Sequence, residues 1–132
     1  MTNTTDFIII EYNLSIKGEV SNMTTNKIKT HDFPVVALIN KIKDWHQNRN
    51  LIEGSTDKDQ VLKLTQELGE LSDSVCKGND IRDDLGDMMV VMINIMVRND
   101  ISMNECLTVA YNDIKDRKGR MVDGIFVKEA DL

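Results

Sequence analysis

Cysteine, proline and aromatic residues are scarce in this sequence, and no long hydrophobic run is present. The 132 residues include two cysteines, Cys76 and Cys106, which lie far apart without the short spacing of metal ligands. We therefore expect a reduced, cytoplasmic protein without a disulfide framework or a zinc site. No apolar run reaches the roughly 18 residues that span a bilayer, and the N-terminus lacks the pattern of a secretory signal. We expect no membrane segment.

Positive charge is also in short supply. The formal net charge is -6 and the isoelectric point is near 4.8, whereas a protein that binds the nucleic-acid backbone normally has a basic surface. The composition therefore argues against general nucleic-acid binding. The chain has the length of one domain, and a core of that size is readily completed by a partner subunit. We expect a homodimer or a homotetramer.

The pattern of apolar residues divides the chain into two parts. Residues 1–30 form an N-terminal extension, in which the β-prone segment 7–16 is either a short strand or a stretch that does not pack. Residues 31–132 show helical spacing and predict an all-α domain. The expected architecture is a four-helix bundle without a sheet.

Capping signals set the expected bounds of these four helices. The first covers 33–49, with Asp32 as its cap and Pro34 in its first turn. The second follows a cap within 54–57 and ends near Gly78. Asn79 or Asp80 caps the third, which ends near Arg98. A capping box over residues 102–105 opens the fourth.

The third predicted helix is apolar on nearly all sides after Asp87. It contains Met88, Met89, Met92 and Met96 among β-branched residues. Such a helix needs burial on every side, which a small bundle cannot supply alone. The methionines could line an adaptable ligand groove, but core packing is the simpler interpretation. We therefore expect a subunit interface on this helix.

Two acidic pairs carry most of the functional information. Glu67 and Glu70 lie three residues apart, as do Asp84 and Asp87 on the next predicted helix, so each pair occupies one helix face. An antiparallel hairpin around Gly78 would bring the two faces together. A single pair is usually a solvated surface, but two on adjoining helices are much less ordinary. Four facing carboxylates need a cation, and their hard oxygen atoms suit Mg2+ or Mn2+.

Each acidic pair encloses a Leu-Gly dipeptide. Glycine inside a helix costs about 1 kcal/mol relative to alanine, so Gly69 and Gly86 need a compensating role. We predict that they let the two helices approach closely, as a shared metal ion requires.

A family resemblance rests on these segments, QELGE at residues 66–70 and DLGD at residues 84–87. They resemble the EExxE and ExxD signature of the MazG-like nucleoside triphosphate pyrophosphohydrolases, in the all-α NTP pyrophosphatase superfamily. The resemblance covers roughly residue 45 to the C-terminus. It implies a Mg2+-dependent enzyme that converts a standard or modified (deoxy)nucleoside triphosphate to the monophosphate and pyrophosphate, in nucleotide-pool cleansing. It also implies that the metal ligands are Glu67, Glu70, Asp84 and Asp87, the first two being catalytic.

Two positions depart from the family pattern. Gln66 stands where the family often has its first glutamate, and a glutamine cannot act as a general base. If this position normally helps to activate water, turnover is weak, or one of the metal-ligand carboxylates acts as the general base instead. Asp84 stands where a longer glutamate is usual, which keeps the charge but shortens the reach by one methylene.

Substrate contacts are expected from residues around the acidic pairs. Lys63 and Asn94 lie on the same helix stripes as those pairs. Trp45 either packs in the core or stacks on a base whose edge Asn48 reads, and His46 is a surface or packing residue. A basic run near the C-terminus resembles the family segment that approaches the triphosphate. Its cations could instead merely offset a helix dipole. The run consists of Asn112, Lys115, Arg117, Lys118 and Arg120.

Two other functions are compatible with the same residues. A non-catalytic helical module that senses nucleotides or metal would bind nucleotide without releasing product, and Gln66 keeps this hypothesis open. A di-iron carboxylate bundle normally needs Glu-x-x-His motifs. Neither His31 nor His46 follows a glutamate by three residues, so the di-iron hypothesis is the weaker one.

Overall fold

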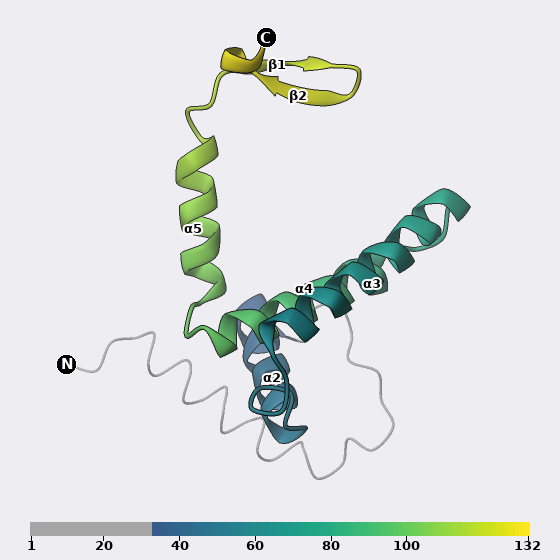
Figure 1. Ribbon diagram of the computed structural model, residues 1–132, viewed down its shortest axis with the longest axis vertical. Coiled ribbons are helices and arrows are strands. Elements are labelled where there is room, and N and C mark those ends of the chain that lie inside the picture. The colour runs from purple at the N-terminus through teal and green to yellow at the C-terminus, as the bar shows by residue number, and fades with distance from the viewer. Residues whose placement is uncertain (1–32) are drawn as a thin grey trace, which may run out of the picture. The chain divides into compact units, whose positions relative to one another are not determined.

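Four helices and a short hairpin make up the part of the chain that the computed structural model describes, residues 33–132 (Figure 1). The helices are α2 (Val35–Asn48), α3 (Asp57–Lys77), α4 (Arg82–Arg98) and α5 (Met103–Ile114). They are followed by β1 (Gly119–Val122), β2 (Ile125–Lys128) and a 3-10 turn, η2 (Glu129–Asp131). The mostly helical architecture is confirmed. The predicted extension, residues 1–30, and the predicted cap at Asp32 lie outside the described residues.

Helix α3 begins and ends at the predicted signals. Thr56 is its N-cap: the Thr56 hydroxyl accepts a hydrogen bond from the Asp59 backbone N–H at 3.2 Å, and the Asp59 carboxylate accepts one from the Thr56 N–H at 2.9 Å. At the other end, Gly78 adopts a left-handed conformation with φ 69°. A residue with a side chain rarely adopts this conformation. Local sequence therefore fixes both ends of the helix.

The start of α5 is predicted correctly and the start of α4 is not. Ser102 and Glu105 form the expected capping box of α5. At α4, however, the residue in the N-cap position is Ile81, which makes no side-chain cap. Asp80 lies one position earlier, where its carboxylate accepts a hydrogen bond from the Arg82 backbone N–H at 3.0 Å. It also forms an ion pair with the Arg82 side chain. Asp80 therefore stabilises the first turn of α4 although it lies outside the helix.

Helices α3 and α4 form the main helix pair of the described chain. Only residues 78–81 separate them, so they run antiparallel and lie side by side (Figure 1). Helix α2 packs against α4 as well. Among the described residues, no helix is both long enough and apolar enough to cross a membrane.

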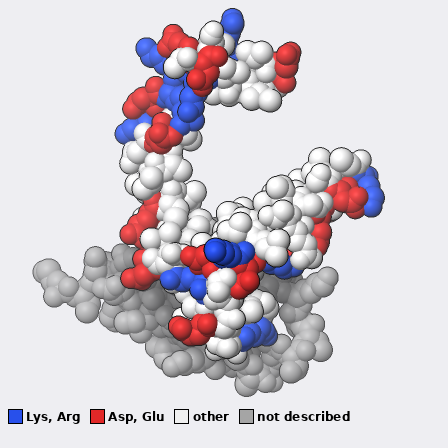
Figure 2. All heavy atoms as spheres, in the orientation of Figure 1, with Lys and Arg blue, Asp and Glu red and all other residues white. Residues whose placement is uncertain are grey.

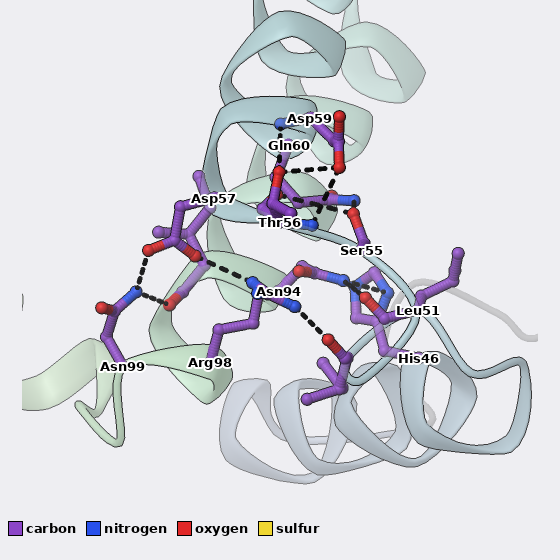
Figure 3. Close-up of polar contacts among 12 residues, drawn as sticks. His46, Leu51, Ser55, Thr56, Asp57, Asp59, Gln60, Asn94, Arg98 and Asn99 are labelled. Carbon is purple, nitrogen blue, oxygen red and sulfur yellow. Dashed lines mark hydrogen bonds and ion pairs between the residues drawn. The ribbon is translucent and has the colours of Figure 1, made fainter.

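A buried polar cluster joins α2 to α4 (Figure 3). His46 is 3% exposed, and its Nε2 lies 2.9 Å from the Val90 carbonyl oxygen. Because a carbonyl only accepts, Nε2 carries the proton, and Nδ1 accepts from the Asn94 amide at 3.2 Å. The same amide nitrogen donates to the Leu51 carbonyl at 3.1 Å. Of the two roles predicted for His46, at the surface or in packing, the structure shows the packing role.

A second polar cluster holds the α2–α3 loop against the end of α4 (Figure 3). Arg98 Nε donates to an Asp57 carboxylate oxygen at 2.8 Å, and the Arg98 guanidinium also donates to the Ile52 carbonyl. The other Asp57 oxygen accepts from the Asn99 amide at 3.0 Å. These hydrogen bonds join the start of α3 to the C-terminal turn of α4.

The hydrophobic core of the described chain is small. Val91 and Ile93 of α4 are its buried hydrophobic residues, whereas Met89 on the same helix is half exposed. The all-round burial predicted for this helix is therefore incomplete within one chain.

The C-terminal hairpin corrects the prediction of a fold without a sheet. β1 pairs with β2 in antiparallel register, with Val122 opposite Ile125. The two residues between them, Asp123 and Gly124, have φ values of 48° and 82°. An Asp-Gly turn with positive φ at both positions is the preferred two-residue connection between strands. The sequence carries this signal, between apolar residues, and the helical interpretation overlooked it.

The predicted role of the two helix glycines is also wrong within the chain. Among residues 33–132, a Cβ atom added at Gly69 or Gly86 would meet no atom within 4 Å outside the glycine's own stretch of helix. Helices α3 and α4 therefore pair without needing the small size of either glycine.

Candidate functional site

Glu67 lies in the predicted acidic cluster and is almost completely buried. Its residue is 5% exposed, and its Oε1 lies 2.6 Å from Nζ of Lys63, one turn earlier in α3. A buried carboxylate is unfavourable unless a positive charge and hydrogen bonds compensate it. Lys63, predicted to contact substrate, supplies that compensation in the structure.

Glu70 is exposed and is held by a different neighbour. Nε2 of Gln66 donates a hydrogen bond to Oε1 of Glu70 at 3.2 Å. Each carboxylate of the α3 pair is thus engaged by the side chain four residues before it, Glu67 by Lys63 and Glu70 by Gln66. Gln66, where the family often has a glutamate, acts here as a hydrogen-bond donor.

Asp84 and Asp87 approach this pair from α4. Burial raises the pKa of Asp87 above its ordinary value, and the negative charges of Asp83, Glu67, Glu70 and Asp84 raise the pKa further. A carboxyl group whose pKa rises for these reasons lies among other carboxylates. Across the antiparallel pair of α3 and α4, Glu67 and Glu70 therefore lie close enough to Asp87 for their charges to act on it.

The negative charges of the same acidic residues also act on Lys63, whose charge is positive. Its hydrogen bond to Glu67 raises the Lys63 pKa, burial opposes that rise, and the charges of Glu67, Glu70 and Asp87 add to it. The ammonium group therefore lies in the field of both helices. Asp83, which the sequence interpretation omitted, belongs to this electrostatic environment. Its position one residue before Asp84 was the available signal.

The donor atoms of the cluster fit Mg2+ or Mn2+ in kind. They are carboxylate oxygens on two facing helices, and such hard oxygen donors suit both ions. Among residues 33–132, no three acidic, histidine or cysteine side chains converge as ligands of one ion do. Glu67 instead points to Lys63, and Glu70 accepts from Gln66. Metal binding would therefore require these side chains to exchange their present partners.

Asn94 is a predicted substrate contact that the structure places in the interior. It has no exposed surface, and its amide nitrogen donates to His46 and to the Leu51 carbonyl. Its Oδ1 has no hydrogen-bond partner within the described part of the chain. In this position Asn94 connects two helices and a loop.

Trp45 and Asn48 lie near the end of α2. Trp45 is 43% exposed, so it is not a fully buried core residue. The Arg49 guanidinium lies 4.6 Å from the centre of its ring, a cation–π contact that covers one ring face. Asn48 is exposed as well.

The predicted basic run spans the end of α5 and the start of the hairpin. Figure 2 shows Lys and Arg side chains there, interleaved with acidic ones. Arg117 forms an ion pair with Asp113 of α5, and Arg120 lies in β1. The side chains of Asn112, Lys115 and Lys118 are exposed. This run is a mixed-charge surface rather than a purely basic one.

Sequence comparison finds a similar phage protein. The chain is 42% identical over 66 residues to an uncharacterized 18.2 kDa protein in the rep-hol intergenic region of Haemophilus phage HP1 (strain HP1c1). The matched region covers 48% of this chain and 40% of the phage protein. The chain therefore spans less than half the length of this relative. No protein-family model matches the sequence, and no solved structure shows significant similarity.

Proposed function

We propose that this chain is a Mg2+-dependent nucleoside triphosphate pyrophosphohydrolase. The observation that carries the proposal is the buried Glu67 carboxylate of α3 beside the antiparallel helix α4, where the charges of Glu67 and Glu70 act on Asp87 and raise its pKa. Such a concentration of negative charge suits a divalent cation and a phosphate substrate bound through it. The MazG-like spacing of the same residues supports this interpretation.

The chain's residues divide the reaction between them. The four carboxylates would hold Mg2+, or Mn2+ in its place, and the bound ion would neutralise phosphate charge. Glu67 or Glu70 accepts the proton of the attacking water. Water attacks the α-phosphorus, so the products are a nucleoside monophosphate and pyrophosphate. Lys115, Arg117 or Lys118 offsets the charge on the leaving pyrophosphate.

Assembly into a homodimer or homotetramer in the cytoplasm is part of the same proposal. The exposed hydrophobic residues Leu62 and Leu68 of α3 and Leu107 and Val109 of α5 support it. An apolar groove of about 480 Å³ between α2, α4 and the start of α5 adds to this surface. Apolar surface of this kind, where it is contiguous, commonly marks a protein–protein interface.

Pyrophosphate release tests the enzyme directly. We would incubate the protein with standard, deoxy and damaged nucleoside triphosphates, with Mg2+ or Mn2+, and quantify pyrophosphate. Glu70→Gln preserves side-chain size at an exposed position and should lower metal-dependent release roughly 100-fold or more. Asp73→Asn is the matched control, because Asp73 is an exposed α3 carboxylate paired with Lys77 outside the cluster. The proposal fails if Glu70→Gln retains full activity.

One observation favours a second candidate function, a non-catalytic nucleotide or metal sensor. Gln66 supplies a hydrogen bond to Glu70 in place of a family carboxylate, which removes one candidate general base. A sensor would bind nucleotide in the presence of metal and release no pyrophosphate. Binding measured by calorimetry alongside the release assay distinguishes the two functions.

A further inference from the structure

Lys63 and Lys77 each form an ion pair within α3, and the two pairs differ in how far they are buried. Each lies four residues from its partner on α3, and each N–O distance is 2.6 Å, between Lys63 and Glu67 and between Lys77 and Asp73. The Lys77 and Asp73 side chains are both more than 60% exposed, whereas the Glu67 side chain is 6% exposed. An exposed pair of this kind contributes little. The Lys63 pair compensates a buried charge.

The position of Lys63 joins the acidic cluster to open solvent. Its side chain is 46% exposed although its Nζ contacts buried Glu67. Lys63 also borders a shallow, open part of the α3 surface, together with Asp59, Leu62, Thr65 and Gln66. Because a lysine side chain has four rotatable bonds, the ammonium can leave Glu67 for this open surface without movement of the backbone.

We propose that Lys63 takes the place of the divalent cation in the metal-free protein and turns outward to bind a substrate phosphate when the cation arrives. This inference rests on the proposed function, because it requires a metal at the acidic cluster. Glu67 keeps a cationic partner in both states, Lys63 in one and the metal in the other. A freed lysine beside a metal–phosphate site then binds phosphate as a point charge.

The first test compares Lys63→Met with Lys77→Met. The control removes the same charge from the same helix and breaks a pair of the same length. Without nucleotide, Lys63→Met should bind Mn2+ about tenfold more tightly, because the competing ammonium is gone; this is the usual effect of one charge-assisted hydrogen bond. With Mg2+ present, the same variant should bind a non-hydrolysable nucleoside triphosphate about tenfold more weakly. Lys77→Met should change neither affinity, and Lys63→Arg should restore nucleotide binding.

A second test uses the unmodified protein and is independent of how any variant folds. Reductive methylation of lysines, followed by peptide mass spectrometry, measures how available each amine is. Adding Mg2+ should speed methylation of Lys63 several-fold and leave that of Lys77 unchanged.

The outcomes separate this inference from the proposed function. If wild-type protein binds no Mn2+, the metal site and the proposed function fail together. If it binds Mn2+ while Lys63→Met binds it equally well, or while the Lys63 methylation rate stays constant on adding Mg2+, the metal site stands and the role of Lys63 is overturned.

Discussion

The segment from α2 to α4 and the segment from α5 to the C-terminus are built differently. The first contains all the buried residues of the described chain, which are His46, Glu67, Val91, Ile93 and Asn94. A hydrogen bond between Asn94 and His46 joins two of its helices. The second contains none of the buried residues: α5 exposes Leu107 and Val109, and the hairpin exposes Met121, Ile125 and Phe126.

A single chain can therefore stabilise the segment from α2 to α4, whereas α5 and the hairpin need further contacts. A two-stranded hairpin is marginally stable in water by itself, and a short isolated helix is too. Packing and polar clusters hold α2 to α4 within one chain, whereas the apolar residues of α5 and the hairpin remain available for another surface. We expect mutations to affect the two segments in correspondingly different ways.

The largest contrast should come from truncating one apolar residue in each segment. Ile93 is 3% exposed and Leu107 is 61% exposed. In dilute solution, where sedimentation shows a monomer, Ile93→Ala should lower the free energy of unfolding by about 3 kcal/mol through cavity formation. Leu107→Ala should change it by less than about 0.5 kcal/mol. Equal losses in urea unfolding would show that α5 is packed within a single chain.

Two asparagines give the next contrast. Asn94→Ala removes the donor to His46 and to the Leu51 carbonyl, leaving buried acceptors unpaired, and should cost about 2 kcal/mol. Asn112→Ala, on the exposed surface of α5, should stay within about 0.5 kcal/mol of wild type. The same urea titrations measure both, and a small effect of Asn94→Ala would show that the buried cluster does not hold α2 to α4.

Two glycines should respond with opposite signs. Gly69→Ala places a methyl group where the described part of the chain has no packing atom within 4 Å, and it should stabilise α3 by about 0.5–1 kcal/mol. Gly124→Ala should destabilise the hairpin, because Gly124 has φ 82°. Thermal unfolding measures the stability of both variants, and sedimentation measures the assembly of Gly69→Ala. Loss of assembly in Gly69→Ala would place a second chain against this glycine.

The smallest effect concerns acid stability. Hydrogen bonds from Asn99 and Arg98 hold the pKa of Asp57 below its ordinary value of 3.8. The folded state therefore binds this proton less readily than the unfolded state. The stabilisation is fully present above pH 3.8 and is lost as the pH falls through the lower folded pKa. Asp57→Asn should flatten the loss of thermal stability in this acidic range, and an unchanged pH profile would contradict the assignment.

Local signals in the sequence were sufficient for much of the fold. Thr56, Gly78 and Ser102 set helix ends through contacts within a few residues, and the acidic pairs follow from helix periodicity and one short turn. The hairpin was missed although Asp123-Gly124 carried its signal.

Contacts between distant segments were harder to predict. Asn94 has the polarity of a substrate contact, and its burial depends on His46 and on the Leu51 carbonyl more than 40 residues away. The partner of Glu67 lies only four residues away, but that spacing does not reveal that the carboxylate is buried.

The most direct test of the central claim is anomalous diffraction from crystals grown with Mn2+ and a non-hydrolysable nucleoside triphosphate. We expect a manganese peak bound by carboxylates of Glu67, Glu70, Asp84 and Asp87, phosphate oxygens on the same ion, and Lys63 turned from Glu67 to a phosphate. A peak bound elsewhere, or no peak while the Lys63–Glu67 ion pair persists, would contradict it.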